Sequence, residues 1–309
     1  TQDALLAFCD NYLQRAEVLR VWWFGGEPTI CMPVLDRVQT GLLELAAKHN
    51  AEVEPGEIIT NGYLLDAKMA RHLLELQISK AQVTVDGPEA IHDRRRKLAN
   101  GKGTFQRILD NLSEAADIME INVRVNIDKE NVDSAFEVVE ILQRRGILSK
   151  IKVHFGQVLS VGSACANLRD RCFTDMDFSR VRVQIYNKLH EMGIYIYQYP
   201  TVRVAGASCG ALAEGYYVVG PDGHMYRCWE DISLGAEKAI GSVLAVLAPV
   251  LRGAPGTLVP YFESLGMVFG DGANAFTGYD QTSYMLFLPD TTPEHARRQM
   301  PPPCVAEFP

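Results

Sequence analysis

The stretch Val21-Trp22-Trp23-Phe24-Gly25-Gly26-Glu27-Pro28 decides the fold of this chain. An apolar run typical of a strand ends here in two glycines, an acid and a proline. Two residues without side chains let a ligand approach the backbone, and the proline fixes the exit from the strand. The Glu27 carboxylate is suited to an ammonium group. These residues therefore predict a strand end that meets a small molecule.

The composition indicates a folded protein with a full core, because 47% of the 309 residues are hydrophobic and 22% are charged. The net charge of −8 argues against a nucleic-acid binder or a polybasic membrane anchor, and no apolar stretch is long enough to span a membrane. We therefore expect a cytoplasmic protein. Seven scattered cysteines do not indicate a disulfide framework, and the basic run 94–97 predicts a solvated loop.

Strand patterns alternate with helical patterns over the first 200 residues. Strands are expected at 18–24, 57–60, 81–86, 121–127 and 151–155, and helices at 32–49, 67–76, 103–119, 132–145 and 178–192. This alternation predicts an α/β fold with a parallel sheet and outer helices, closed into a whole or partial TIM-like (β/α) barrel. Its chemistry is expected at the carboxyl ends of the strands.

The texture of the sequence changes near residue 200, where glycine and aromatic residues become more frequent. A strand entering the turn 221–223 is expected there, and 245–309 is rich in proline and glycine with one helical pattern at 258–265. We therefore predict two domains, a barrel over 1–200 and a small, loop-rich domain over 201–309.

The later strands also end in polar residues, and these ends converge on one mouth in a barrel. Glu27 and Arg124 are suited to the ammonium and carboxylate groups of an amino acid, and Thr84 and Asp86 to a ribose. Each motif taken alone also fits an ordinary turn or a core residue. The ordered series in a βα frame favours a binding site.

Four segments carry a resemblance to a known family: 23–29, 60–65, 84–93 and 103–105. They resemble the radical S-adenosylmethionine (radical SAM) superfamily, in particular the branch with a C-terminal SPASM domain, which includes peptide-modifying maturases and anaerobic sulfatase-maturating enzymes. In the second half, Cys209, Gly223 and Cys228 have the spacing of the opening SPASM motif. The resemblance covers nearly the whole chain.

The resemblance implies a [4Fe–4S] cluster that reductively cleaves S-adenosylmethionine (SAM), and a 5′-deoxyadenosyl radical that modifies a side chain of a peptide or protein substrate. It also implies that Gly25, Gly26 and Glu27 hold the methionine amine and that Thr84 meets the ribose. The full cofactor-binding set is Gly25, Gly26, Glu27, Pro28, Asn61, Thr84, Asp86 and Arg124.

The sequence departs from this family in its cysteines. The C-x3-C-x2-C triplet that holds the radical SAM cluster does not occur, so we expect that the first barrel strand and the cluster loop are missing. Thiolates are needed to hold the cluster, and the 309 residues by themselves are expected not to cleave SAM reductively.

The SPASM pattern is degenerate as well. Aligned on 287–289, the four expected cysteine positions hold Thr282, Met285, Thr291 and His295, and only Cys304 remains after them. The remaining metal set is Cys209, Cys228 and His295. An auxiliary cluster, a zinc site and plain buried thiols stay open as alternatives.

Three functions remain open. The first is a radical SAM/SPASM enzyme, or a fragment of one, acting on a peptide or protein. The second is a catalytically inactive derivative that binds a peptide or protein partner, favoured by cysteines replaced within a segment that is present. The third is an unrelated aldolase-like barrel that uses His154 and Asp86 for acid–base chemistry.

Overall fold

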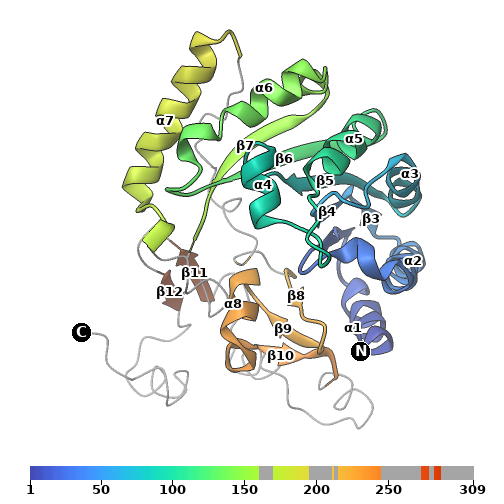
Figure 1. The fold of residues 1–309 in the computed structure, drawn as a ribbon. Coiled ribbons are helices and arrows are strands. Elements are labelled where there is room, and N and C mark those ends of the chain that lie inside the picture. Colours follow the sequence, from blue (N-terminus) through green and yellow to red (C-terminus); the bar gives the residue numbers. More distant parts are fainter. Residues whose placement is uncertain (160–169, 195–210, 212–214, 245–272, 278–281, 287–309) are drawn as a thin grey trace. The chain divides into compact units, whose positions relative to one another are not determined.

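The computed structural model describes residues 1–159, 170–194, 211, 215–244, 273–277 and 282–286 (Figure 1). The chain divides into two compact units. The larger contains residue 2 and residues 9–200, and the smaller contains residue 1, residues 3–8 and residues 201–309. Each unit is described by itself below.

The larger unit is built on a parallel five-stranded sheet in the order β2-β4-β5-β6-β7. Its strands are β2 (Trp22–Trp23), β4 (Gly56–Thr60), β5 (Ile78–Thr84), β6 (Glu120–Ile127) and β7 (Lys152–Gln157). Its helices are α2 (Met32–His49), α3 (Ala67–Glu75), α4 (Glu89–Arg95), α5 (Phe105–Ala115), α6 (Glu137–Arg144) and α7 (Asp175–Glu191), with 3-10 turns η1 (Pro28–Cys31), η2 (Val132–Ser134) and η3 (Leu148–Lys150). The predicted α/β fold with a parallel sheet is confirmed.

The single strand predicted at 18–24 is wrong, because the chain forms two short strands in different sheets. β1 (Val18–Leu19) pairs with β3 (Glu52–Val53), whereas β2 pairs with β4. The segment that pairs with β1 and β2 contains Pro55 between β3 and β4, and proline has no N–H to continue the hydrogen-bond ladder. The Leu19 carbonyl accepts a hydrogen bond from the N–H of Glu54, before the proline. The Val21 carbonyl accepts one from the N–H of Glu57, after it.

The two faces of the sheet differ in chemistry. Along β6, residues 121, 123, 125 and 127 are buried and belong to the apolar core shared with the helices. The residues between them are polar and only partly buried. On this polar face Thr84 lies beside Arg124, and Arg124 beside His154, in neighbouring strands. One face of the sheet is therefore polar, and on β5, β6 and β7 its polar side chains extend toward the carboxyl ends of the strands.

The smaller unit contains an antiparallel sheet of β8 (Val218–Val219), β9 (His224–Tyr226) and β10 (Gly241–Ser242), with α8 (Trp229–Leu234) and η6 (Ala236–Lys238). Its buried cluster joins Ala4 of α1 (Gln2–Leu13) to Met225 and Val243. A hairpin of β11 (Ala273–Thr277) and β12 (Thr282–Leu286) lies in the segment expected to be loop-rich. The helical pattern expected at 258–265 lies outside the described residues.

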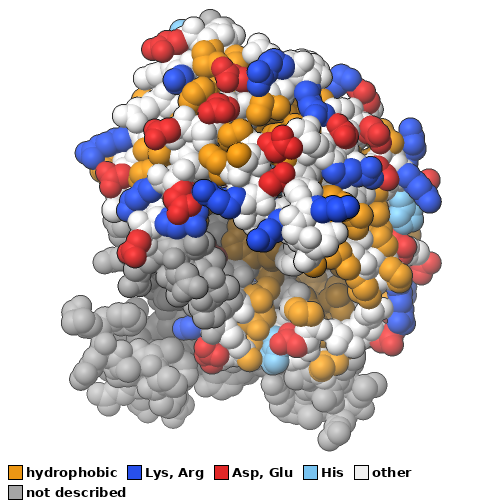
Figure 2. Space-filling model, in the orientation of Figure 1, with side chains coloured by type: hydrophobic (Ala, Val, Ile, Leu, Met, Phe, Trp, Pro, Cys, Tyr) orange, Lys and Arg blue, Asp and Glu red, His pale blue; other side chains and the backbone are white. Residues whose placement is uncertain are grey.

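Charged side chains of both signs are intermixed on the face of the larger unit drawn in Figure 2. In the part of the chain that the structure describes, no helix combines the length and the apolar character needed to cross a bilayer.

Candidate functional site

Glu27 fastens the end of β2 to the end of β4. Its Oε1 accepts hydrogen bonds from the N–H and hydroxyl of Thr29, at 3.1 and 2.6 Å, and from the hydroxyl of Thr60 at 2.7 Å. Its Oε2 accepts from the N–H of Asn61 at 2.6 Å. The four bonds fix the carboxylate at the sheet edge, and Oε2, with one donor, retains capacity to accept another.

The two glycines before Glu27 adopt left-handed conformations, with φ of +96° at Gly25 and +51° at Gly26. A β-carbon placed on either residue meets no described atom within 4 Å. The backbone conformation therefore explains the glycines, and the space beside them is open to a ligand.

The turn after β4 is held by two amides. The side-chain oxygen of Asn61 accepts from the N–H of Tyr63 at 2.8 Å, which closes an Asx turn. The side-chain amide of Asn111 in α5 donates to the carbonyls of Gly62 and Tyr63, at 2.9 and 2.8 Å. Asn61 thus has a structural role in this turn as well as the binding role predicted for it.

Asp86 is the centre of a second polar group, at the ends of β5 and β6. Its buried carboxylate accepts from Nε of Arg96 at 2.5 Å and from the side-chain amide of Asn126 at 3.1 Å. The oxygen of Asn126 accepts in turn from Nε of Arg124 at 2.8 Å. The amide of Asn131 donates to the backbone carbonyl of Asp86 at 2.6 Å. Asp86 and Arg124 are therefore joined through one amide.

The buried His92 accepts a hydrogen bond from the backbone N–H of Asp86. The N–H of Asp86 lies 3.3 Å from Nδ1 of His92, and Nε2 of His92 lies 3.1 Å from the Thr104 hydroxyl, which donates to the Arg96 carbonyl at 2.6 Å. This order of donors assigns a neutral ring with its proton on Nε2. Burial lowers the pKa of His92 to about 4, so the ring stays neutral at pH 7.

Asp93 ties α4 to the start of α5. One carboxylate oxygen accepts from the N–H groups of Thr104 and Phe105, at 2.7 and 2.9 Å. The carboxylate fills the space where a side chain at Gly103 would lie. The residues Asp93, Gly103 and Thr104 are thus explained by one contact between α4 and the start of α5.

Arg124 and His154 lie side by side on the polar face of the sheet. The guanidinium of Arg124 packs so closely on Gly156 that a β-carbon there would come within 2.7 Å of it. Burial lowers the pKa of Arg124, and no described carboxylate forms an ion pair with it. Nδ1 of His154 lies 2.9 Å from the side-chain oxygen of Asn122, and burial with the nearby Arg124 charge lowers the pKa of His154 to about 4. The buried Arg124 charge fits a site for a negatively charged group, whereas His154 is neutral at pH 7.

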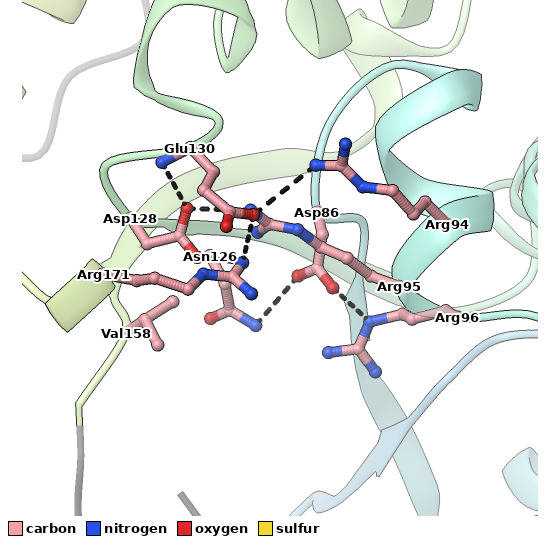
Figure 3. A pocket seen from close by; sticks show the side chains of 9 residues that line it. All are labelled: Asp86, Arg94, Arg95, Arg96, Asn126, Asp128, Glu130, Val158 and Arg171. Atoms are coloured by element: carbon pink, nitrogen blue, oxygen red, sulfur yellow. Dashed lines mark hydrogen bonds and ion pairs between the residues drawn. The ribbon is translucent and has the colours of Figure 1, made fainter. Parts of the chain in front are cut away.

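The prediction that 94–97 is a solvated loop is wrong in part, because Arg94 and Arg95 are helical and Arg95 and Arg96 are partly buried, although Arg94 is exposed. Arg94 and Arg95 belong to α4 and Arg96 follows it, and all three line an open pocket of about 1010 Å³ (Figure 3). The remaining lining residues are Asp86, Asn126, Asp128, Glu130, Val158 and Arg171. Sequence reasoning missed this because the carboxylates that pair with the arginines come from the ends of β5 and β6.

The predicted cofactor residues thus fall into two groups at the same edge of the sheet. Glu27 is bonded directly to Asn61, and Asp86 is linked to Arg124, which lies beside Thr84. Gly25, Gly26 and Pro28 flank Glu27. Arg96 and Asn131 were missed, and no spacing in the sequence points to them.

The predicted metal residues are mostly beyond what the structure describes. Cys209 and His295 lie outside the described residues, whereas Cys228 is partly buried at the start of α8. The described cysteines are Cys9, Cys31, Cys172 and Cys228. Among the described residues, no three His, Cys, Asp or Glu side chains gather as a metal site would require. The described part of the chain therefore does not fit a [4Fe–4S] cluster.

Comparison with known proteins gives one family. The family model of the radical SAM superfamily matches residues 1–142. The chain is 31% identical over 123 residues to the Fe-coproporphyrin III synthase of Methanosarcina barkeri (strain Fusaro / DSM 804), covering 40% of this chain and 28% of that protein. It therefore spans less than a third of that relative.

Solved structures share the fold. Native anSMEcpe with bound AdoMet (S-adenosylmethionine) is 19% identical with a TM-score of 0.60, over 84% of this chain and 71% of that one. Streptococcus suis SuiB bound to precursor peptide SuiA is 11% identical with a TM-score of 0.50, over 74% and 54%. The family model thus covers less than half of the chain, and these structures show that the chain shares their fold.

Proposed function

We propose that the larger unit binds SAM at the carboxyl edge of its sheet and acts on a peptide or protein. The observation that carries the proposal is the pair of polar groups around Glu27 and Asp86, which occupy the ends of adjacent parallel strands. Ligands of α/β folds bind at this edge.

The chemistry of SAM matches the groups that are present. Its ammonium is suited to Oε2 of Glu27 and the open backbone at Gly25 and Gly26, and its ribose hydroxyls to Thr84 and Asp86. Its carboxylate is suited to Arg124, which has no ion pair with a described carboxylate.

The peptide part of the proposal is supported by two of the similar proteins. One structure of anSMEcpe contains AdoMet and the Kp18Cys peptide, and SuiB was solved with precursor peptide SuiA. Both have the fold of this chain at low sequence identity. The cytoplasmic location expected from the sequence stays a prediction.

Binding of SAM tests the proposal directly. Isothermal titration of the purified chain with SAM should give saturable binding, and Arg124→Gln should weaken it about tenfold, because a charge-assisted pair with the carboxylate is lost. Arg107→Gln is the matched control, since Arg107 is 53% exposed, lies 3.9 Å from Asp66 and does not line the pocket. Equal affinities of the Arg124 and Arg107 variants would contradict the proposal.

A second candidate function is a catalytically inactive module that binds a peptide or protein. It is favoured by the cysteine positions, because Thr282, Met285 and Thr291 replace expected cysteines within a segment that is present. The genomic reading frame decides whether such a triplet lies upstream. A full-length protein reconstituted anaerobically with iron and sulfide should then release 5′-deoxyadenosine from SAM if it is an enzyme. No product above background would favour the module.

We also propose that residues 201–309 form a degenerate SPASM-like domain. The proposal is supported by the spacing of Cys209 and Cys228 around Gly223. Elemental analysis of the purified protein tests the metal set. One zinc per chain, lost in Cys228→Ser, would favour a site of Cys209, Cys228 and His295, and a metal-free protein would favour plain thiols.

A further inference from the structure

The outer half of the pocket in Figure 3 lies beyond the residues proposed to bind SAM. It is formed by Arg94 and Arg95 of α4, by Asp128 and Glu130 after β6, and by Arg171. These residues come from three separate segments of the larger unit. The backbone of Lys129 also donates to the Arg171 carbonyl at 3.0 Å, which fixes the third segment against the second.

Asp128 is the buried anchor of this outer half. Its side chain is 2% exposed, and its two oxygens accept from Arg95 at 2.8 Å and from Arg171 at 2.7 Å. The N–H of Glu130 adds a further bond at 2.9 Å. These contacts lower the pKa of Asp128 against the opposing effect of burial. Asp128 is therefore ionised, and both of its carboxylate oxygens are occupied by donors of the protein itself.

Glu130 is the remaining carboxylate, and three guanidinium groups compete for it. Arg171 approaches it to 2.8 Å, whereas Arg94 and Arg95 stay at 3.5 Å. Three arginines thus share two carboxylates, which leaves one uncompensated positive charge. Arg94 is the least engaged of the three, because its side chain is 63% exposed and its contact with Glu130 is long.

Two further donors are left without partners in this group. Nε of Arg95 and Nε of Arg171 are buried and have no hydrogen-bond acceptor among the described residues. Buried arginine donors are normally paired. Because both Nε atoms are buried, they are closed to an entering ligand, and the surplus charge that faces the open pocket is carried by the exposed Arg94.

We propose that this outer half binds an acidic side chain of the peptide substrate. The proposal rests on the peptide part of the proposed function and adds the chemistry of the residue that is recognised. A carboxylate entering the pocket would pair with the exposed guanidinium of Arg94 and would neutralise the surplus charge. The acidic chain as a whole, with a net charge of −8, would otherwise repel such a peptide, so recognition depends on this local reversal of sign.

Fluorescence anisotropy with two labelled probes tests the proposal. The probes are twelve-residue Gly/Ser peptides that carry either Glu-Glu or Gln-Gln at their centre. The wild-type chain should bind the Glu-Glu probe about fivefold more tightly at low salt, the scale of one partly exposed ion pair, and less so at high salt. Arg94→Gln should bring this ratio close to one, and Arg94→Glu should invert it.

Arg107→Gln again serves as the matched control, and it should keep the wild-type ratio because Arg107 is similarly exposed outside the pocket. An unchanged ratio in both Arg94 variants would overturn the proposal. Displacement of the Glu-Glu probe by inorganic phosphate at lower concentration than by free glutamate would also overturn it, in favour of a phosphate site.

Titration of the wild-type chain with SAM alone separates this proposal from the proposed function. SAM binding without any Glu-Glu preference would refute only the acidic-peptide site. A Glu-Glu preference without SAM binding would refute only the cofactor site.

Discussion

The contact between Asp93 and Gly103 leads to a double-mutant cycle. Asp93→Ala removes one carboxylate oxygen that accepts from two N–H groups at the start of α5. Gly103→Ala places a methyl group 2.0 Å from the other carboxylate oxygen and 2.5 Å from the carboxyl carbon, so the whole carboxylate has to move. The two substitutions therefore break one interaction from its two sides.

The structure sets the magnitude. The two hydrogen bonds measure 2.7 and 2.9 Å, their acceptor is charged, and Thr104 and Phe105 are both buried. Loss of a charged cap of this kind costs about 2–3 kcal/mol of unfolding free energy. Each single variant should lose about this amount. The double variant should lose hardly more than Asp93→Ala alone, because Gly103 has no left-handed φ and a methyl group there no longer meets the carboxylate.

Urea unfolding of the four proteins, followed by circular dichroism, measures the coupling. The expected interaction energy is about 2 kcal/mol, and each single variant should lower the urea midpoint by about 1 M. Asp93→Asn is the conservative control, because its amide oxygen can still accept from both N–H groups. Additive losses in the double variant would refute the reasoning, since they would mean that Gly103 and Asp93 do not share one space.

Two further predictions concern the same edge of the sheet. The pKa of buried His92 is about 4 in the folded protein against 6.5 in the unfolded chain, so its contribution to stability is complete above pH 6.5 and is lost as the pH falls toward 4, by roughly 3 kcal/mol. Urea midpoints measured between pH 4 and 7.5 should therefore decline less steeply in His92→Gln than in the wild type. Parallel curves for the two proteins would contradict this. Gly62→Ala should destabilise the protein by about 2–4 kcal/mol, because Gly62 has φ +78° and a β-carbon would lie 2.6 Å from Val83. Gly101→Ala is the control and should cost only about 1 kcal/mol in the same assay, since Gly101 has φ +82° but open space around it. Equal losses in the two variants would show that the Val83 contact is unimportant.

The sequence by itself determined most of the longer elements of the larger unit, although it missed β3 and α4 and merged β1 with β2. The apolar alternation at 121–127 predicted β6 because every second residue of a half-buried strand faces the core. The leucine spacing at 32–49 predicted α2 with its observed bounds. The residues at the strand ends, from Gly25 to Arg124, were predicted to form a binding set because the end of a parallel strand is a local feature of sequence, and their binding role stays a prediction.

Only the tertiary structure decided how the charges are used. Arg94, Arg95 and Arg96 resemble any exposed basic run, since their partners Asp86, Asp128 and Glu130 lie up to 36 residues away in the chain. The break between β1 and β2 likewise goes with their different partners, because β1 pairs with β3 and β2 with β4, on either side of Pro55. Periodicity and turn chemistry act over a few residues, but the sign and occupancy of a pocket depend on segments that meet only after the sheet has formed.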